Sequence, residues 1–123
     1  MKLITAPIVA AFLSIASMGS ALAEADAELV RAHPSVASTV RQPPAEVSLT
    51  FSNVVDPNAS SVRVFDNAGI RVDEGRRHIA PDDAKLLSVG LKDLAPGTYK
   101  VVWEATALDS HKTTGTFNFT YTP

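Results

Sequence analysis

The sequence predicts an all-β fold, a sandwich or small barrel of about seven short antiparallel strands. From Asp26 onward, no stretch keeps a helical hydrophobic period, and apolar and polar residues instead alternate over short runs. Pro, Gly, Asn and Asp separate these runs at the intervals that a sandwich requires. The alternation is one-sided, which indicates antiparallel sheets with one buried face and one solvated face.

The first 23 residues are expected to be a signal peptide and not part of the fold. Lys2 supplies a positive start, and residues 3–18 are almost wholly apolar. This apolar run is short for a membrane span, and no basic cluster follows it to stop transfer. Ala21-Leu22-Ala23 has the small-x-small pattern of a cleavage site, and Ala23-Glu24-Ala25 has it too. Cleavage after residue 23 or after residue 25 therefore stays open.

The remainder, residues 24–123, is expected to form one domain with no membrane span. It carries ten Lys and Arg (11 less Lys2) against 13 Asp and Glu, a net charge of −3. The basic residues are scattered, which argues against a nucleic-acid partner. The chain has no cysteine, so disulfides and thiolate ligands are excluded. Both methionines precede residue 24, so the domain also lacks the thioethers that favour Cu(I).

The first half of the domain contains the shorter predicted strands. Pro34 ends the first of them, and the Pro43-Pro44 pair precedes the second. In that second strand Val47, Leu49 and Phe51 share one face. The strands are expected at residues 27–32, 46–52, 61–65 and 70–72.

The second half contains the longest strand. Residues 74–83 are polar and contain Pro81, so we expect a loop there with at most one helical turn. Further along, Tyr99, Val101 and Trp103 lie on one face of an alternating run, and Trp103 is expected to pack in the interior. A loop at residues 109–114 should lead into the last strand. The strands are expected at residues 85–91, 98–108 and 115–121.

Three histidines of the domain are candidate ligands. His78 follows Arg76-Arg77, where cations disfavour metal binding, and His33 is expected to be an ordinary surface residue. His111 follows Asp109 by two positions, which in an extended chain places both on one side with about 6.5 Å between α-carbons. Their side chains could converge on one metal ion, or form a hydrogen bond that merely orders the loop.

The residues give little support to an enzyme. Ser110 lies between Asp109 and His111 but would point away from both in an extended segment, against the geometry of a catalytic triad. Asp82 and Asp83 are adjacent and face apart in a polar loop. The sequence contains neither a G-x-S-x-G elbow nor a glycine-rich phosphate loop. We therefore expect no catalytic activity.

Three segments resemble the CopC-type periplasmic copper resistance proteins. The segment from Tyr99 to Phe119 resembles the family signature, with Val-Trp at 102–103, Asp109-Ser110-His111, and Gly115 followed by alternating Phe. Pro44 to Ser52 is similar to the early Pro-x-x-Val-x-Leu-x-Phe-Ser strand of the family. Leu29 to Pro34, with Thr39-Val40, resembles its opening. The match covers essentially the whole domain in order.

The resemblance implies a cupredoxin-like Greek-key β-sandwich that binds Cu(II). In the family, the ion is held by the N-terminal His of the mature chain, through its amine and imidazole, and by the Asp and His that Asp109 and His111 match. Family openings read His-Ala-x-Leu, whereas this chain reads Asp-Ala-Glu-Leu from Asp26. The implied metal ligands are therefore Asp109, His111 and Asp26. One imidazole in place of two should weaken Cu(II) binding.

The amine of Asp26 would be available only after cleavage at residue 25. Cleavage after residue 23 would displace the amine by two residues.

The resemblance also implies a function. The expected protein is a periplasmic copper carrier or buffer in copper resistance and homeostasis, which holds one Cu(II) ion and has no methionine site for Cu(I). A CopD-like inner-membrane copper protein is the implied partner. The alternative is a metal-independent interaction module on the same fold, in which Asp109 and His111 only order their loop.

Overall fold

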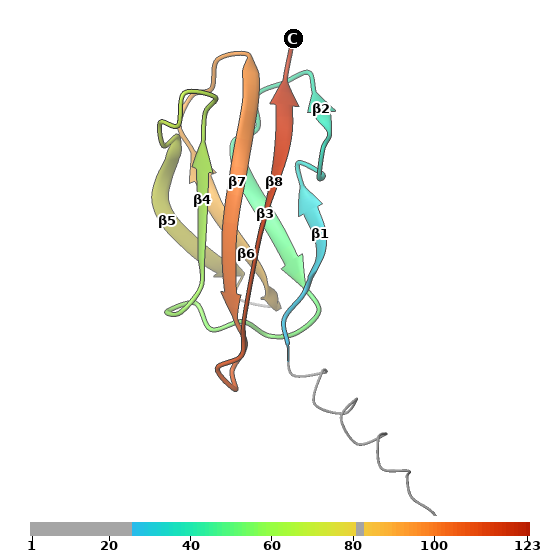
Figure 1. Ribbon diagram of the computed structural model, residues 1–123, viewed down its shortest axis with the longest axis vertical. Coiled ribbons are helices and arrows are strands. Elements are labelled where there is room, and N and C mark those ends of the chain that lie inside the picture. The colour runs from blue at the N-terminus through green and yellow to red at the C-terminus, as the bar shows by residue number, and fades with distance from the viewer. Residues whose placement is uncertain (1–25, 81–82) are drawn as a thin grey trace, which may run out of the picture.

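The computed structural model describes residues 26–80 and 83–123, with the backbone alone at residues 76–80. The predicted signal peptide and its cleavage sites lie outside the described residues. Within these ranges the regular elements are all strands (Figure 1), and none of the described residues form a helix that is long and apolar enough to cross a membrane. The strands are β1 (Leu29–His33), β2 (Thr39–Val40), β3 (Glu46–Phe51), β4 (Ser61–Phe65), β5 (Asp73–Ala80), β6 (Asp83–Leu91), β7 (Gly97–Thr106) and β8 (Lys112–Tyr121).

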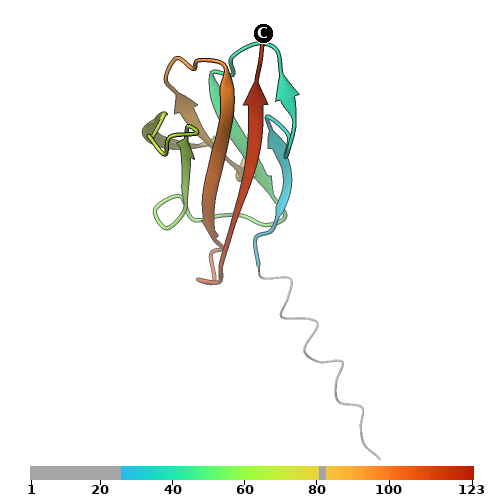
Figure 2. The same ribbon diagram turned by 45° about the horizontal axis from the view of Figure 1, so that its top comes forward.

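Two four-stranded sheets pack face to face, as Figure 1 and Figure 2 show. Their strand orders are β1-β3-β6-β5 and β2-β8-β7-β4. The neighbours are antiparallel except for the short pair of β2 and β8, which is parallel. Two pairs of strands that follow each other in the sequence, β5–β6 and β7–β8, are also hydrogen-bonded neighbours in a sheet. Each of the other connections between successive strands crosses from one sheet to the other. The predicted cupredoxin-like Greek-key sandwich is confirmed.

The core follows the alternation of the sequence. On β7, Tyr99, Val101 and Trp103 are buried between the sheets, as predicted. The Trp103 ring meets the Phe51 ring of the opposite sheet edge-on, with 5.3 Å between centroids. A T-shaped pair of rings stabilises the fold by more than the burial of its apolar surface alone would. Trp103 therefore joins the two sheets, which confirms its expected role in the interior.

Gly115 faces Trp103 across the β7–β8 register. A Cβ at position 115 would lie 2.5 Å from Cζ2 and 2.7 Å from Cε2 of the indole. No side chain fits at that distance, so the indole occupies the space that glycine leaves. The pairing explains why a Trp and a Gly occur together in this part of the sequence.

The prediction of a loop at residues 74–83 is wrong, because β5 occupies most of that range. β5 pairs with β6 along the sheet edge, with an irregular register between Asp73 and Arg77. Gly75 has a φ of 80°, a left-handed conformation that glycine adopts without cost. An edge strand can be polar throughout, since pairing needs only backbone groups and one neighbour. The polar composition therefore concealed a strand.

Other boundaries also differ from prediction. The predicted strand at residues 70–72 forms only a single bridge, between Arg71 and Phe65. β2 was not predicted as a strand, because two residues are too few to show an alternation of apolar and polar side chains. The last strand begins at Lys112 and not at residue 115, so the β7–β8 connection is shorter than predicted.

Asp73 links β4 to β5 from a buried position. Its side chain is fully buried and lies 2.9 Å from Nε of Arg71. The backbone N–H groups of Val64 and Gly75 each donate to it at 2.8 Å. Burial is the largest influence and acts to raise the pKa of Asp73, but the hydrogen bonds from Arg71, Val64 and Gly75 together lower it. The carboxylate is thus held ionised in the core.

Candidate metal centre

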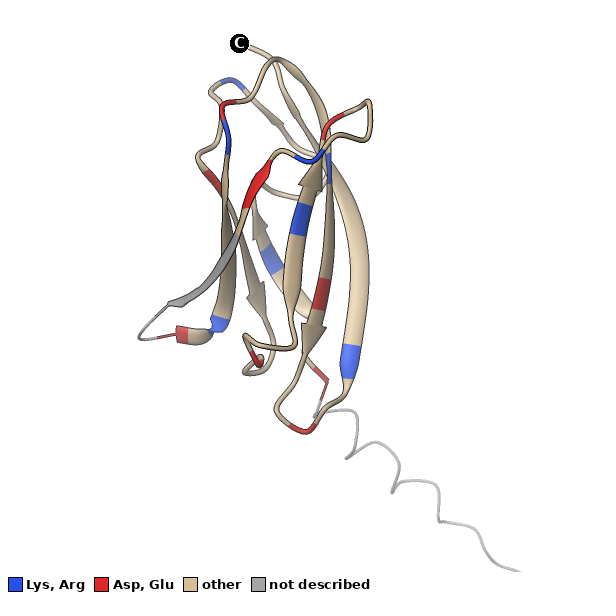
Figure 3. Cartoon of the chain, turned by 90° about the vertical axis from the view of Figure 1, so that its left-hand side faces the viewer, with Lys and Arg blue, Asp and Glu red and all other residues tan. Residues whose placement is uncertain are grey.

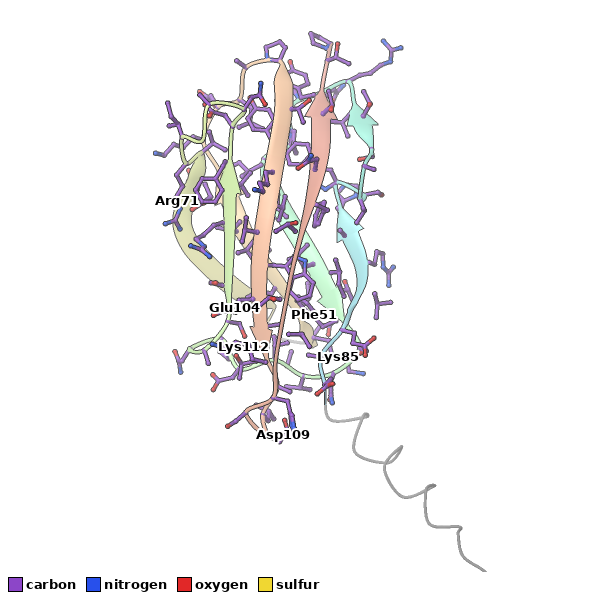
Figure 4. All side chains as sticks on the ribbon, in the orientation of Figure 1. Phe51, Arg71, Lys85, Glu104, Asp109 and Lys112 are labelled. Carbon is purple, nitrogen blue, oxygen red and sulfur yellow. The ribbon has the colours of Figure 1, made fainter. Side chains whose placement is uncertain are left out.

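The β7–β8 hairpin carries the candidate centre at one end of the sandwich. Its tip extends beyond the other strands, and Asp109 lies there (Figure 4). The Ala107 N–H donates to the His111 carbonyl at 2.9 Å, which closes the loop at its base. The Ser110 N–H donates to the Ala107 carbonyl at 2.9 Å. These bonds make the loop a tight turn and not the extended segment on which the sequence argument relied.

Ser110 produces the turn. Its φ of 77° lies in the left-handed region that few residues other than glycine adopt. The expected convergence of Asp109 and His111 is present, but it comes from this turn and not from the two-residue period of a strand.

Asp109 and His111 form a close, exposed pair. Oδ2 of Asp109 lies 2.8 Å from Nδ1 of His111, and Oδ1 accepts the His111 backbone N–H at 3.1 Å. The side chains are 43% and 60% exposed, so an ion in solution can reach both. The structure shows the hydrogen-bonded arrangement, the second of the two that the sequence left open.

Each member of the pair shifts the pKa of the other. The His111 backbone N–H, followed by its ring, lowers the pKa of Asp109. The hydrogen bond to Asp109 and its charge raise the pKa of His111, and the charge of Asp26 adds to the same effect. Asp109 is therefore ionised at neutral pH and available as an oxygen donor.

The segment Asp26–Glu28 lies beside the hairpin at the same end of the molecule (Figure 1 and Figure 2). The side chain of Ala27 is fully buried, and its carbonyl accepts the Thr113 hydroxyl at 2.5 Å. On the other side, the Glu28 N–H donates to Oγ of Ser52 at 2.9 Å, and the Ser52 N–H donates to the Glu28 carbonyl at 2.8 Å. The segment is thus bonded to both sheets.

The predicted ligands are brought together only in part. Within residues 26–80 and 83–123, no three His, Asp or Glu side chains form a group that could hold a metal ion. Asp109 and His111 meet directly, and Asp26 lies close enough for its charge to act on His111. His33 lies at the far end of β1 from Asp26. His78 lies on β5 opposite Ser88, at the edge of the other sheet.

The donor pair of Asp109 and His111 suits a divalent copper ion. An imidazole nitrogen together with a carboxylate oxygen is a donor set that suits Cu(II). A bound ion would replace the proton that Nδ1 and Oδ2 share in their 2.8 Å hydrogen bond. The described part of the chain contains no Cys or Met, so soft Cu(I) ligands are absent from it.

The end of the sandwich that carries the pair has charges of both signs. Figure 3 shows Asp and Glu on the loops at this end and Lys on the strands that lead into them. At the base of the hairpin, Nζ of Lys112 lies 3.3 Å from the carboxylate of Glu104. The exposed carboxylate of Asp109 attracts cations over the range of a Debye length.

Comparison with known proteins relates this chain to a family of copper proteins. The CopC domain family matches residues 29–122. Protein YobA of Escherichia coli K12 is 34% identical over 98 residues, which cover 77% of this chain and 77% of YobA. The copper transport protein CutJ of Bacillus subtilis is 29% identical over 96 residues, which cover 77% of this chain but only 18% of CutJ.

Solved structures agree with this result. CopC of Methylosinus trichosporium OB3b superposes with a TM-score of 0.70 at 31% identity, covering 80% of this chain and 95% of that one. PcoC of Escherichia coli, a methionine-rich copper resistance protein, gives 0.68 at 28% identity, covering 79% and 99%.

Proposed function

Because the chain belongs to the CopC domain family, we propose that it binds one Cu(II) ion in the bacterial periplasm and acts as a copper carrier or buffer. The proposal rests chiefly on one observation, the exposed 2.8 Å pair of Asp109 and His111 at the tip of the hairpin. The names of two related proteins, a copper transport protein and a copper resistance protein, support it. It involves no catalytic step.

The proposed roles follow from ligand chemistry. The imidazole of His111 is the main nitrogen donor, and Asp109 supplies an oxygen and lowers the net charge of the bound ion. In the full chain the nitrogen of Asp26 belongs to a peptide bond. Cleavage after residue 25 would free it as an amine and complete a chelate with the Asp26 carboxylate. Cleavage after residue 23 would leave the pair without this third partner.

A Cu(II) titration of the exported protein tests the proposal, after its N-terminus has been sequenced. Trp103 is the single tryptophan of the chain, so its fluorescence reports binding. Asp109→Ala and His111→Ala should each weaken binding by at least about tenfold, because each removes a donor. His33→Ala, remote from the hairpin, is the matched control and should bind as the wild type does. Equal affinity of the wild type and His111→Ala would rule out the site.

The N-terminal sequence tests the role of Asp26 separately. A chain that begins at Asp26 should bind Cu(II) more tightly than one that begins at Glu24. A mature start at Glu24 would count against chelation by Asp26.

A metal-independent interaction module is the second candidate. The hydrogen bonds that tie Asp109 to the ring and backbone of His111 order the loop without any ion, which favours this alternative. A folded wild type that does not bind Cu(II) would support it. For the copper carrier or buffer we propose a CopD-like inner-membrane copper protein as the partner, on the basis of the family alone.

A further inference from the structure

We infer that Thr113 is a positioning residue that holds the N-terminal segment beside the Asp109–His111 pair. The hydroxyl of Thr113 donates to the carbonyl of Ala27, and this bond spans 86 positions of the sequence. The inference rests on the proposed function, since it concerns the partner that the N-terminus would supply to the same site.

The argument starts from the burial of Ala27. Its side chain is fully buried at the end of the core, while Asp26 before it is half-buried and Glu28 after it is exposed. A buried carbonyl that loses its donor incurs a desolvation penalty, because water cannot replace the bond freely. The Thr113 hydroxyl therefore stabilises Ala27 in its buried position.

Successive carbonyls of the segment point to opposite sheets, as expected of an extended backbone. The carbonyl of Ala27 faces Thr113 on β8, whereas that of Asp26 faces Oγ of Ser52 at 3.4 Å, after the end of β3. Ser52 also bonds Glu28 through both its backbone and its side chain. Ser52 thus fixes the segment to one sheet, and Thr113 links it to the sheet that carries the site.

Thr113 lies two residues after His111 on the same chain. Two residues of chain span at most about 7 Å between α-carbons, whatever path the chain takes. An anchor at Thr113 thus sets the distance from Ala27, and so from Asp26, to His111. Without it, the segment keeps its bonds to Ser52 but loses its link to the hairpin, and the third partner of the site is no longer held in place.

Substitutions at Thr113 test this role by Cu(II) titration. Thr113→Val keeps the shape and removes the hydroxyl, and it should weaken Cu(II) binding about tenfold, as loss of an outer-sphere bond commonly does. Thr113→Ser restores the donor and should restore wild-type affinity. Thr116→Val is the matched control, because Thr116 lies on the same strand and faces outward. Far-UV circular dichroism and the urea midpoint check that each variant is folded.

A second measurement needs no metal. The backbone amide of Glu28, which donates to Oγ of Ser52, should exchange with solvent faster in Thr113→Val than in the wild type or Thr116→Val, because its segment is less firmly held. Adding Asp26→Ala to Thr113→Val should cost less affinity than Asp26→Ala costs in the wild type, since the two changes act on one contact.

The outcomes separate this inference from the proposed function. If His111→Ala loses Cu(II) but Thr113→Val binds as the wild type does, the function stands and the role of Thr113 is overturned. If the wild type itself does not bind Cu(II), the proposed function fails, and amide exchange alone then decides whether Thr113 holds the segment. Unchanged amide exchange in Thr113→Val would overturn the anchor regardless of any metal.

Discussion

At the scale of single residues, the contact between Trp103 and Gly115 shows how one missing Cβ shapes the core. The indole lies where a side chain at 115 would stand, and it also packs edge-on against Phe51 of the other sheet. The ring therefore cannot move away without losing its contact across the sandwich. Close packing of this kind makes the interior sensitive to a single added methyl group.

Gly115→Ala should destabilise the fold by about 1–3 kcal/mol, because the new Cβ would overlap the Trp103 ring. Urea unfolding followed by Trp103 fluorescence measures this. Gly90→Ala is the matched control on β6, where the new Cβ would meet only the mobile end of the Glu74 side chain. Equal midpoints for the two variants would contradict the steric argument.

The sequence predicted that Asp109 and His111 lie together but not the geometry around them. Asp109 and His111 were recognisable from the family pattern in which they lie. The turn depends on a left-handed Ser110, which no propensity argument favours. The contacts of Ala27 with Thr113 and of Glu28 with Ser52 join residues 86 and 24 positions apart. Such pairs are set by strand register, which one sequence does not reveal.

At the scale of elements, Asp73 holds the β4–β5 connection by several hydrogen bonds at once. Its carboxylate takes two backbone N–H groups and the Arg71 guanidinium while it is buried. A buried charge is tolerated only when such partners replace water. The connection therefore depends on the ionised form of one residue.

Asp73→Asn should lower the free energy of unfolding at pH 7 by about 1–3 kcal/mol, since a charge-assisted bond to Arg71 is lost. The pKa of Asp73 is lowered in the folded protein, below the value of about 3.9 for an unfolded chain. Its contribution is thus fully present above about pH 4 and is lost as pH falls through the folded pKa.

Urea unfolding at pH 7 and near pH 3 checks this pH dependence. The difference in free energy of unfolding between the wild type and Asp73→Asn should be smaller near pH 3 than at pH 7. The exposed control Asp93→Asn should be as stable as the wild type at both pH values. A gap that is constant with pH would show that the carboxylate charge is not responsible.

Most elements were predictable because their burial follows the alternation of side chains. The strand predicted at 61–65 matches β4 at both ends, and β3 and β7 agree to within one or two residues. β5 was missed because an edge strand of polar residues has no hydrophobic period. β2 was missed because its parallel pairing with β8 involves only Thr39 and Val40.

At the scale of the whole molecule, the proposed site lies where the two sheets meet. The hairpin belongs to the sheet of β2, β8, β7 and β4, while β1, which follows Asp26, belongs to the other. A metal ion held by Asp26, Asp109 and His111 would therefore cross-link the sandwich. Ligand binding to the folded state alone stabilises the whole fold.

Cu(II) at 100 times its dissociation constant should stabilise the wild type by about 2.7 kcal/mol and raise Tm by on the order of 10 °C. Differential scanning calorimetry, with and without a chelator, measures the shift. His111→Ala should show little of it. A rise of the same size in His111→Ala would point to copper bound elsewhere.

The hydrogen bond that the Asp73 carboxylate accepts from β4 also protects the protein against aggregation through that strand. An outer strand with free backbone groups can recruit another chain, and such edges start fibrils. β4 is an outer strand, yet its Val64 N–H is taken by Asp73 and its Val64 carbonyl by the Val72 N–H. Among the other outer strands, β2 has two residues, and β1 and β5 have irregular registers. The described sandwich thus offers no long, regular edge on which a second copy could add as a strand.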